Sequence, residues 1–460
     1  MGAANDARTL DGLQGAAARP YAAGVTVSQP APAPAPAQPP ALPPAIDTPA
    51  LVVFVDRVWA NIQRLQAEMD QRGIALRPHV KTHKSVRIAR MQVHAGARGL
   101  TVGTLGEAEV MASAGLRDLF LAYPLWAEGP KATRLRAVHD TADLRVGVDS
   151  VAAAERLAAA VRGGRRPLRV VIEIDSGLHR TGVATPDEAA TVAKAAAAAG
   201  LEVIGVFTHG GHAYRPGAAG GVALDEVTAL ERGAAALEAA GFEVSVISAG
   251  STPTRTLSAA GRVTEMRAGT YALGDRQQVA LGAIGPDDVA AVVAATVVAA
   301  RPGRAVLDAG AKALTKDVPA FVEGFGSIPA WPGSVIEKVN DYHGMVALSA
   351  APRPAIGDVV AARPGRAVLD AGAKALTKDL PAFVEGFGSI PAWPGAVIEK
   401  LNDYHGMVAL SAAPRPAIGD LVAVVPNHIC PVVDLVSSFV AVGTDGRADH
   451  WAVDARGRSG

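Results

Sequence analysis

The chain has only one cysteine, Cys430, in 460 residues. A single cysteine excludes an intramolecular disulfide and agrees with a cytoplasmic location, which we expect. The chain also has no net charge, because 44 Lys and Arg residues balance 44 Asp and Glu residues. Without a basic field, we expect neither nucleic acid nor a membrane surface as a partner.

The sequence has no uninterrupted apolar run long enough to cross a membrane, and its first residues lack the pattern of a signal peptide. Apolar residues nevertheless make up 49% of the chain, which allows a large core spread over two or three domains. Residues 1–45 end in a proline- and alanine-rich stretch. Because proline at this density excludes regular helix and sheet, we expect a disordered leader there.

From residue 46 onward, short β-branched segments alternate with alanine-rich amphipathic segments. Repeated β-α units of this length imply a parallel sheet with right-handed crossovers. Over residues 46–285 they predict a (β/α)8 barrel, with an open doubly wound sheet as the alternative. The predicted strands lie at 51–55, 75–80, 99–102, 118–122, 143–148, 169–174, 203–208, 244–248 and 265–268, and the predicted helices at 57–72, 84–95, 105–114, 150–162, 187–199 and 224–240.

Residues 286–460 are rich in valine, glycine and proline and predict a mostly β domain. Within it, residues 300–361 and 362–423 are near-copies offset by 62 positions. A tandem duplication is the simplest explanation, and an assembly artefact is the alternative. One domain has room for one set of strands, so the copies compete. We expect one copy to occupy the domain fully or in part and the other to form an excrescence or a partial second lobe. We favour the second copy as the native-like one, because it runs directly into the His428 segment. The copies differ at only four pairs of positions, Val318/Leu380, Ser334/Ala396, Val339/Leu401 and Val359/Leu421.

The segment RPHVKTHK, residues 77–84, follows a predicted strand and carries Lys81. The carboxyl ends of barrel strands carry active sites, and a lysine there can form a Schiff base if its pKa is lowered. The alternative is a solvated basic loop. The neighbours that could lower this pKa are Arg77, His79, His83 and Lys84.

Two further segments follow predicted strands. EIDSGLHRTGV, residues 173–183, carries Arg180, whose guanidinium can bind a cofactor phenolate or phosphate. FTHGGHAY, residues 207–214, brings His209 and Tyr214 into a glycine-bearing loop, where they can stack on a planar ring or donate to it. A surface ion pair and a packing role are the alternatives for these two segments.

The segments SAGSTPT (248–254) and RAGTYALGD (267–275) follow the last two predicted barrel strands. Small and hydroxyl residues there predict a nest of backbone N–H groups that can hold a phosphate, and ordinary turns are the alternative. In PNHICPVVDL (426–435), His428 and Cys430 have the spacing that places two side chains on one face of a strand. Imidazole and thiolate suit zinc, and a buried cysteine beside a capping histidine is the alternative.

Together these segments resemble the D-threonine aldolase / D-serine dehydratase family, relatives of alanine racemase. The resemblance also rests on IDTPALVV (46–53), GEAEV (106–110) and GDRQQVALG (274–282). It implies a fold type III enzyme with a pyridoxal-phosphate (PLP) barrel and a C-terminal β domain. It implies Lys81 as the Schiff-base lysine, Arg180 at the cofactor hydroxyl, His209 and Tyr214 around the ring, Ser251, Thr252, Gly269 and Thr270 at the phosphate, and His428 and Cys430 at a divalent metal.

The resemblance further implies a homodimeric lyase that acts on a small β-hydroxy D-amino acid by dehydration or aldol cleavage. The cysteine ligand favours zinc over manganese or magnesium, and slightly favours dehydration. An amino-acid racemase is the first alternative, although it needs no metal. A PLP carrier protein corresponds to the barrel alone, and a catalytically inactive relative is the last alternative.

Overall fold

The computed structural model describes residues 41–43, 45–301, 304–314, 319, 321–322, 335–339, 344–347, 367–368, 388–389, 398–401, 406–409 and 420–458. The predicted disordered leader therefore lies almost wholly outside the described residues, as does much of both repeat copies. No helix in the described part of the chain is both long enough and apolar enough to cross a membrane.

The first sheet is an eight-stranded parallel sheet that closes on itself. A bridge between His79 and Thr101 joins its two ends, supported by hydrogen bonds from Arg98 N to Leu76 O (2.8 Å) and from Thr101 N to Pro78 O (2.9 Å). The predicted (β/α)8 barrel is thus confirmed, and the open sheet is excluded. Its strands are β2 (Ala75–Leu76), β3 (Leu100–Val102), β4 (Asp118–Leu121), β5 (Asp143–Val148), β6 (Arg169–Glu173), β7 (Glu202–Phe207), β8 (Val246–Ala249) and β9 (Glu265–Met266).

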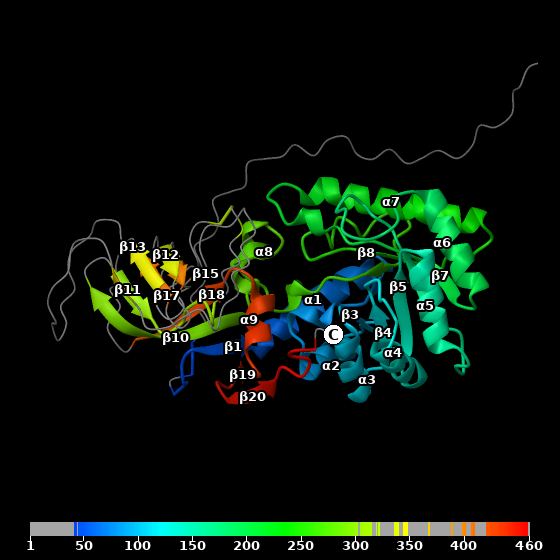
Figure 1. Ribbon diagram of the computed structural model, residues 1–460. Coiled ribbons are helices and arrows are strands. Elements are labelled where there is room, and N and C mark those ends of the chain that lie inside the picture. Colours follow the sequence, from blue (N-terminus) through cyan, green and yellow to red (C-terminus); the bar gives the residue numbers. More distant parts are fainter. Residues whose placement is uncertain are drawn as a thin grey trace, which may run out of the picture. The chain divides into compact units, whose positions relative to one another are not determined.

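Helices surround this sheet (Figure 1). Three of them begin at a hydroxyl side chain, of Thr104, Ser150 or Thr185, that accepts a hydrogen bond from a backbone N–H of the first turn. The helix α4 was not among those predicted, because its charged sequence has little apolar periodicity. The helices are α1 (Val55–Gln71), α2 (Val86–His94), α3 (Leu105–Ser113), α4 (Pro130–Thr141), α5 (Val151–Val161), α6 (Pro186–Ala198) and α7 (Ala219–Ala239).

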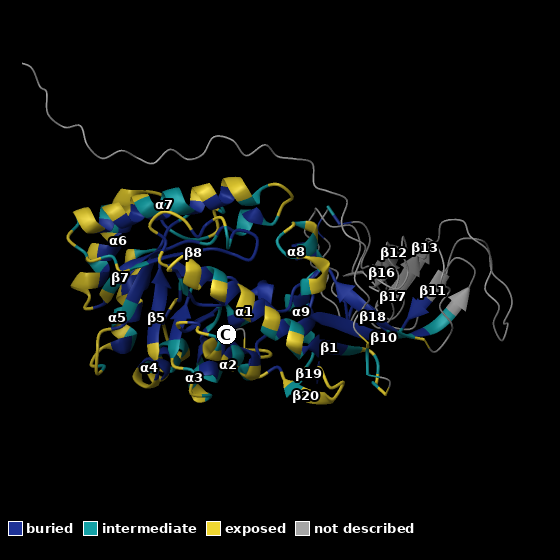
Figure 2. Ribbon diagram, turned by 180° about the vertical axis from the view of Figure 1, so that it is seen from behind, coloured by how far each residue is buried: buried dark blue, intermediate teal, exposed yellow. Residues whose placement is uncertain are grey.

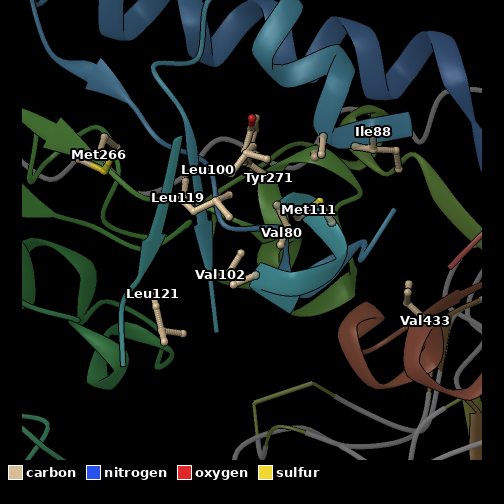
Figure 3. Packing of buried hydrophobic residues seen from close by; sticks show 14 of the residues in the cluster. Val80, Ile88, Leu100, Val102, Met111, Leu119, Leu121, Met266, Tyr271 and Val433 are labelled. Atoms are coloured by element: carbon tan, nitrogen blue, oxygen red, sulfur yellow. The ribbon is translucent and has the colours of Figure 1, made fainter. Parts of the chain in front are cut away.

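The main core lies between the barrel strands and these helices. Figure 2 shows β5 and β7 buried, while the helices around them expose their outer faces. Alanines fill the inner faces of α5 and α6, which lets these helices approach the sheet closely. Near the lysine segment, Val80, Val102 and Met111 pack together without solvent exposure (Figure 3). This packing fixes the start of the loop that carries Lys81.

The second sheet contains β1 (Ala50–Phe54), the strand predicted at 51–55. This strand pairs antiparallel with β10 (Ala291–Arg301) and parallel with β19 (Ser438–Val442), and it pairs with no barrel strand in the described residues. The N-terminal strand therefore ties the β domain to α1, the first helix of the barrel. The strand β18 (Leu421–Pro426) pairs with β10, and β20 (Ala448–Ala452) pairs with β19.

The two repeat copies exchange strands in this sheet. In the first copy lie β11 (Arg304–Leu307), β12 (Val335–Val339) and β13 (Gly344–Ala347); their equivalents in the second copy are β14 (Ala367–Val368), β16 (Ile398–Leu401) and β17 (Gly406–Ala409). Each copy forms its own hairpin, β12–β13 or β16–β17. However, β11 pairs with β17, and β14 pairs with β13, in the same register after the 62-residue offset.

The resulting strand order is β14-β13-β12-β16-β17-β11. If each strand is replaced by its equivalent from the other copy, the same order is obtained in reverse, so the two copies are arranged symmetrically. The two halves meet at Lys338 and Lys400, which are equivalent residues paired with each other. The second copy, which we favour as the native-like one, does not complete the domain by itself, because strands of both copies pair within one sheet. The first copy supplies the strand beside β10, and the second supplies both β17 and the residues that lead into β18. A short strand of the second copy, β15 (Gly388–Ser389), pairs with β18.

Candidate functional site

A cavity of about 370 Å³ lies at the carboxyl ends of the barrel strands, among the loops after β2, β3, β4, β6, β7, β8 and β9. All eight residues that the sequence assigns to cofactor binding line this one cavity. They are Lys81, Arg180, His209, Tyr214, Ser251, Thr252, Gly269 and Thr270. The remaining lining residues are His79, Gly103, Ala122, Tyr123, Thr181, Phe207, Gly250 and Arg267.

Lys81 lies in a short 3-10 turn, η1 (Val80–Thr82). The imidazole of His79 caps this turn by accepting a hydrogen bond from Lys81 N (3.3 Å). Burial lowers the pKa of Lys81, and the positive charges of Arg180 and Arg267 lower it further, against the opposing effects of Cys430 and Glu107. A lowered pKa increases the neutral fraction of this amine near neutral pH, which is the form that attacks an aldehyde.

The positive charge near Lys81 does not come from the sequence neighbours expected to supply it. The turn directs Arg77 into the barrel interior, where it pairs with Asp118 (2.6 Å) and Glu265 (2.7 Å). His83 is fully buried against Gln92, and burial lowers its pKa to about 4. The side chain of Lys84 is likewise turned away, into an ion pair described below. Of the four neighbours, His79 alone lines the cavity.

Two imidazoles in the cavity are kept neutral. Burial lowers the pKa of both His79 and His209 well below the usual value, and the charge of Lys81 adds to the effect in each case. Burial also raises the pKa of the Tyr214 phenol. At neutral pH the cavity therefore offers neutral rings and a protonated phenol, which can stack on a planar ligand or hydrogen-bond it.

The loops after β7 and β8 are held together by a buried carboxylate. Glu226 on α7 accepts hydrogen bonds from Gly210 N (2.9 Å), Gly250 N (3.1 Å) and Ser258 Oγ (2.6 Å). It therefore links the His209 loop to the Ser251 loop. Within the second loop, Thr252 Oγ1 accepts from Tyr271 N (3.1 Å), which joins it to the last loop of the barrel.

The backbone approaches closely at Gly269. A Cβ atom at this position would lie 3.1 Å from both the Cβ and the carbonyl oxygen of His79. Any other residue would therefore push the lysine loop and the Thr270 loop apart. Glycine here lets the two loops line the same cavity.

His428 and Cys430 lie side by side, but not on a strand as expected. His428 is the residue before helix α9 (Ile429–Leu435), and Cys430 lies in the first turn of that helix. Burial would raise the pKa of the Cys430 thiol, but the adjacent His428 and a hydrogen bond to Thr82 leave it lowered. The thiol lies 3.2 Å from Thr82 Oγ1, one residue from Lys81. Among the described residues, no cluster of three or more His, Cys, Asp or Glu side chains could hold a metal.

Sequence reasoning missed Arg267, whose guanidinium lines the cavity floor. It donates to Ser248 Oγ (2.6 Å) and lies over the rings of Phe120 and Phe207. Burial lowers its pKa to about 10. Arg267 is the first residue of the segment RAGTYALGD, directly after β9, but nothing in that segment shows that its side chain faces the cavity.

A closed barrel with a lysine cavity at its carboxyl end, followed by a β domain, defines the class of alanine racemase-like PLP proteins. The family model described as "Alanine racemase, N-terminal domain" matches residues 53–277. A second model, "Putative serine dehydratase domain", matches twice, over residues 290–365 and 361–442. The double match reflects the two repeat copies.

Several relatives match most of the chain. A D-threo-3-hydroxyaspartate dehydratase from Delftia sp. is 37% identical over 422 residues, which is 88% of this chain and 97% of that protein. Its solved structure has a TM-score of 0.67 at 31% identity, covering 89% and 97% of the two chains. A D-threonine aldolase from Arthrobacter sp. is 31% identical over 427 residues, or 90% and 94% of the two chains. The chain therefore belongs to the D-threonine aldolase / D-serine dehydratase family of PLP-dependent lyases.

Proposed function

We propose that this chain is a PLP- and metal-dependent lyase that dehydrates β-hydroxy D-amino acids. The observation that carries the proposal is that a candidate metal ligand, Cys430, lies close to the candidate PLP-binding lysine, Lys81. The thiol of Cys430 contacts Thr82, next to Lys81, so a metal held there would lie beside the cofactor lysine. The relatives support the same class, because they include a D-threo-3-hydroxyaspartate dehydratase and a D-threonine aldolase.

The cavity lining fits PLP by the chemistry of its donors. Lys81 offers an amine of lowered pKa to the aldehyde, and Arg180 offers a guanidinium to the ring hydroxyl. The hydroxyls of Ser251, Thr252 and Thr270 and the backbone at Gly269 suit a phosphate. When bound, PLP supplies an electron sink for the charge that develops at the substrate Cα.

The pair formed by His428 and Cys430 fits a divalent metal, and zinc best of all. An imidazole and a thiol within hydrogen-bonding distance of each other are the nitrogen and sulfur donors that zinc prefers. Two protein ligands leave positions open for substrate. The Delftia relative supports this reading, because its solved structures include a histidine variant and a cysteine variant two positions apart, the latter in a metal-free form. A metal here would act as a Lewis acid on the β-hydroxyl.

Three residues of the cavity would have separate roles in dehydration. With PLP bound, the Nζ atom of Lys81 would be the base that takes the proton from the substrate Cα. His209 and Tyr214 hold the planar ring, and both are neutral at physiological pH. Loss of the Cα proton and of the β-hydroxyl, together one molecule of water, would leave an enamine, which hydrolyses to a keto acid and ammonia.

Product analysis tests this function. Purified protein is incubated with D-serine, D-threonine and D-threo-3-hydroxyaspartate, with and without a chelator. Dehydration gives pyruvate, 2-oxobutyrate and oxaloacetate, whereas aldol cleavage of D-threonine gives glycine and acetaldehyde. Glycine as the main product from D-threonine would show that the protein is an aldolase and not a dehydratase. Products formed equally well after complete metal removal would overturn the metal's role.

We also propose a homodimer located in the cytoplasm. The family resemblance suggests the dimer, and the lone cysteine agrees with the location. Light scattering coupled to size-exclusion chromatography gives the mass, and a single-chain mass would refute the dimer.

A further inference from the structure

Lys84 occupies an unusual position at the end of the lysine loop. Its backbone has a φ of +49°, and its side chain is buried between two carboxylates. The Nζ atom lies 2.8 Å from Asp434 Oδ1 on α9 and 3.4 Å from Glu107 Oε1 on α3. A left-handed conformation is costly for a lysine, so the surrounding contacts must hold it there. Its backbone is held by hydrogen bonds from Lys84 N to Val80 O (2.8 Å) and from Ala455 N to Lys84 O (3.1 Å), and its side chain by the ion pairs with Asp434 and Glu107.

The ion pair between Lys84 and Asp434 joins the loop that carries Lys81 to the helix that carries Cys430. Lys81 and Lys84 lie three residues apart in the loop, while Cys430 and Asp434 lie four residues apart on α9. Residues four apart on a helix lie on the same face. The face of α9 that bears Cys430 therefore rests on the lysine loop through two contacts, Cys430 with Thr82 (3.2 Å) and Asp434 with Lys84 (2.8 Å).

The C-terminal segment reinforces the same junction. Ala455 N donates to the carbonyl of Lys84 (3.1 Å), and Arg456 Nε donates to the carbonyl of Asp434 (3.2 Å). Neighbouring residues of one segment thus bind both members of the ion pair. The lysine loop and α9 are held as one unit from three directions, by Cys430, by Lys84 and by this segment.

Electrostatic interactions make Lys84 the residue on which this junction between the lysine loop and α9 depends most. Glu107 is 1% exposed and also accepts from Gly103 N (2.7 Å), so loss of the ammonium would leave a buried carboxylate without its cation. Burial alone would lower the pKa of Lys84, but Asp434 and Glu107 raise it, so the side chain stays charged. The ammonium therefore attracts both the barrel and α9 across the physiological pH range.

We propose that Lys84 is a positioning residue, which holds α9 against the lysine loop so that the His428 and Cys430 pair faces Lys81. This inference rests on the proposed function, because it takes the pair as the metal ligands. Lys84 would touch neither metal nor substrate. Its effect would be on where the metal is held.

The test measures zinc affinity and cofactor binding separately. We expect Lys84→Met to weaken zinc binding about 10- to 100-fold in a chelator competition, the range seen when supporting partners of ligands are lost. PLP absorbance and its borohydride-fixed adduct on Lys81 should remain. Asp434→Asn should weaken zinc binding less than Lys84→Met, because the ammonium of Lys84 still balances the buried Glu107 and can still donate to an amide oxygen at position 434. Lys84→Arg should restore part of the loss. The double variant should bind zinc no worse than Lys84→Met.

Arg87→Met is the matched control, since Arg87 also joins α2 to the C-terminal region, through an exposed pair with Asp449 (2.8 Å) on β20 and not through α9. It should leave zinc affinity unchanged. Zinc affinity in Lys84→Met or Asp434→Asn equal to that of the wild type would overturn the inference. Should Lys84→Met not fold, Asp434→Asn alone decides. Failure of the wild type to bind zinc, or undiminished binding in Cys430→Ala, would instead overturn the proposed function.

Discussion

The barrel and the duplicated part of the second sheet follow the same local rules but reach different outcomes. In the barrel each strand sequence occurs once, and each strand pairs with neighbours set by the β-α connections. In the repeat each strand sequence occurs twice, so the sequence permits two partners for every strand. The hairpins form within a copy, because their connections are short, while β11 and β14 take partners from the opposite copy. Local sequence selects the strand, and connectivity selects the partner.

The same contrast separates unique residues from redundant ones. Lys81, His428 and Cys430 lie outside the repeat and have no second copy, whereas the repeat holds two versions of every residue it contains. Substitutions at unique positions should therefore abolish function, while removal of one copy should be tolerated.

Lys81→Ala should have the largest effect. Without the amine, no residue remains at this position to attach PLP covalently or to take the proton from Cα. Activity should therefore fall by at least ~10²–10⁴-fold. Absorbance spectra and peptide mapping after borohydride reduction measure the adduct. An adduct found on another lysine would show that the assignment is wrong.

His428→Ala and Cys430→Ala should come next. Each removes a proposed metal ligand, so dehydration should fall by about 10²–10³-fold while the PLP absorbance stays, because neither side chain lines the cavity. Activity is assayed with D-serine, and bound metal by elemental analysis. Full activity in the double variant would eliminate the metal from the mechanism.

Much of this site was predictable from sequence, because its residues follow strands of a recognisable barrel. The eight positions that the sequence assigns to cofactor binding converge in one cavity, since the carboxyl ends of parallel strands meet at one end of a barrel. What could not be predicted depends on side-chain direction and on partner choice. The inward course of Arg77 and Arg267, the helix at Cys430 and the strand exchange all arise from tertiary contacts that no local pattern encodes.

Glu173→Gln should have a moderate effect on stability within the barrel. Burial raises the pKa of Glu173 to about 7, and its Oε2 atom has no hydrogen-bond partner among the residues that the structure describes. In the unfolded chain this carboxyl ionises near 4.5. A raised folded-state pKa therefore destabilises the fold as pH rises from about 4.5 to about 7, by at most ~3 kcal/mol.

Urea unfolding of the wild type and Glu173→Gln at pH 5 and pH 8 measures this dependence. The variant should gain stability relative to the wild type at pH 8 but little at pH 5. Glu202→Gln, at an exposed position of β7, is the control and should show no such pH dependence. An equal difference at both pH values would contradict the raised pKa.

Deletion of one repeat copy should have the smallest effect. Removal of residues 300–361 or of 362–423 leaves one set of strands, and the two products differ only at the four divergent positions. In either product β10 keeps a strand equivalent to β11, and the single hairpin supplies the partner that β17 now provides. Because Lys81 and His428 are untouched, both proteins should be soluble, bind PLP and retain activity with D-serine. Thermal unfolding should show each to be at least as stable as the full chain, since one set of strands then has no second copy competing for the same partners. Insoluble or cofactor-free protein from both deletions would show instead that the exchanged arrangement is an essential part of the fold.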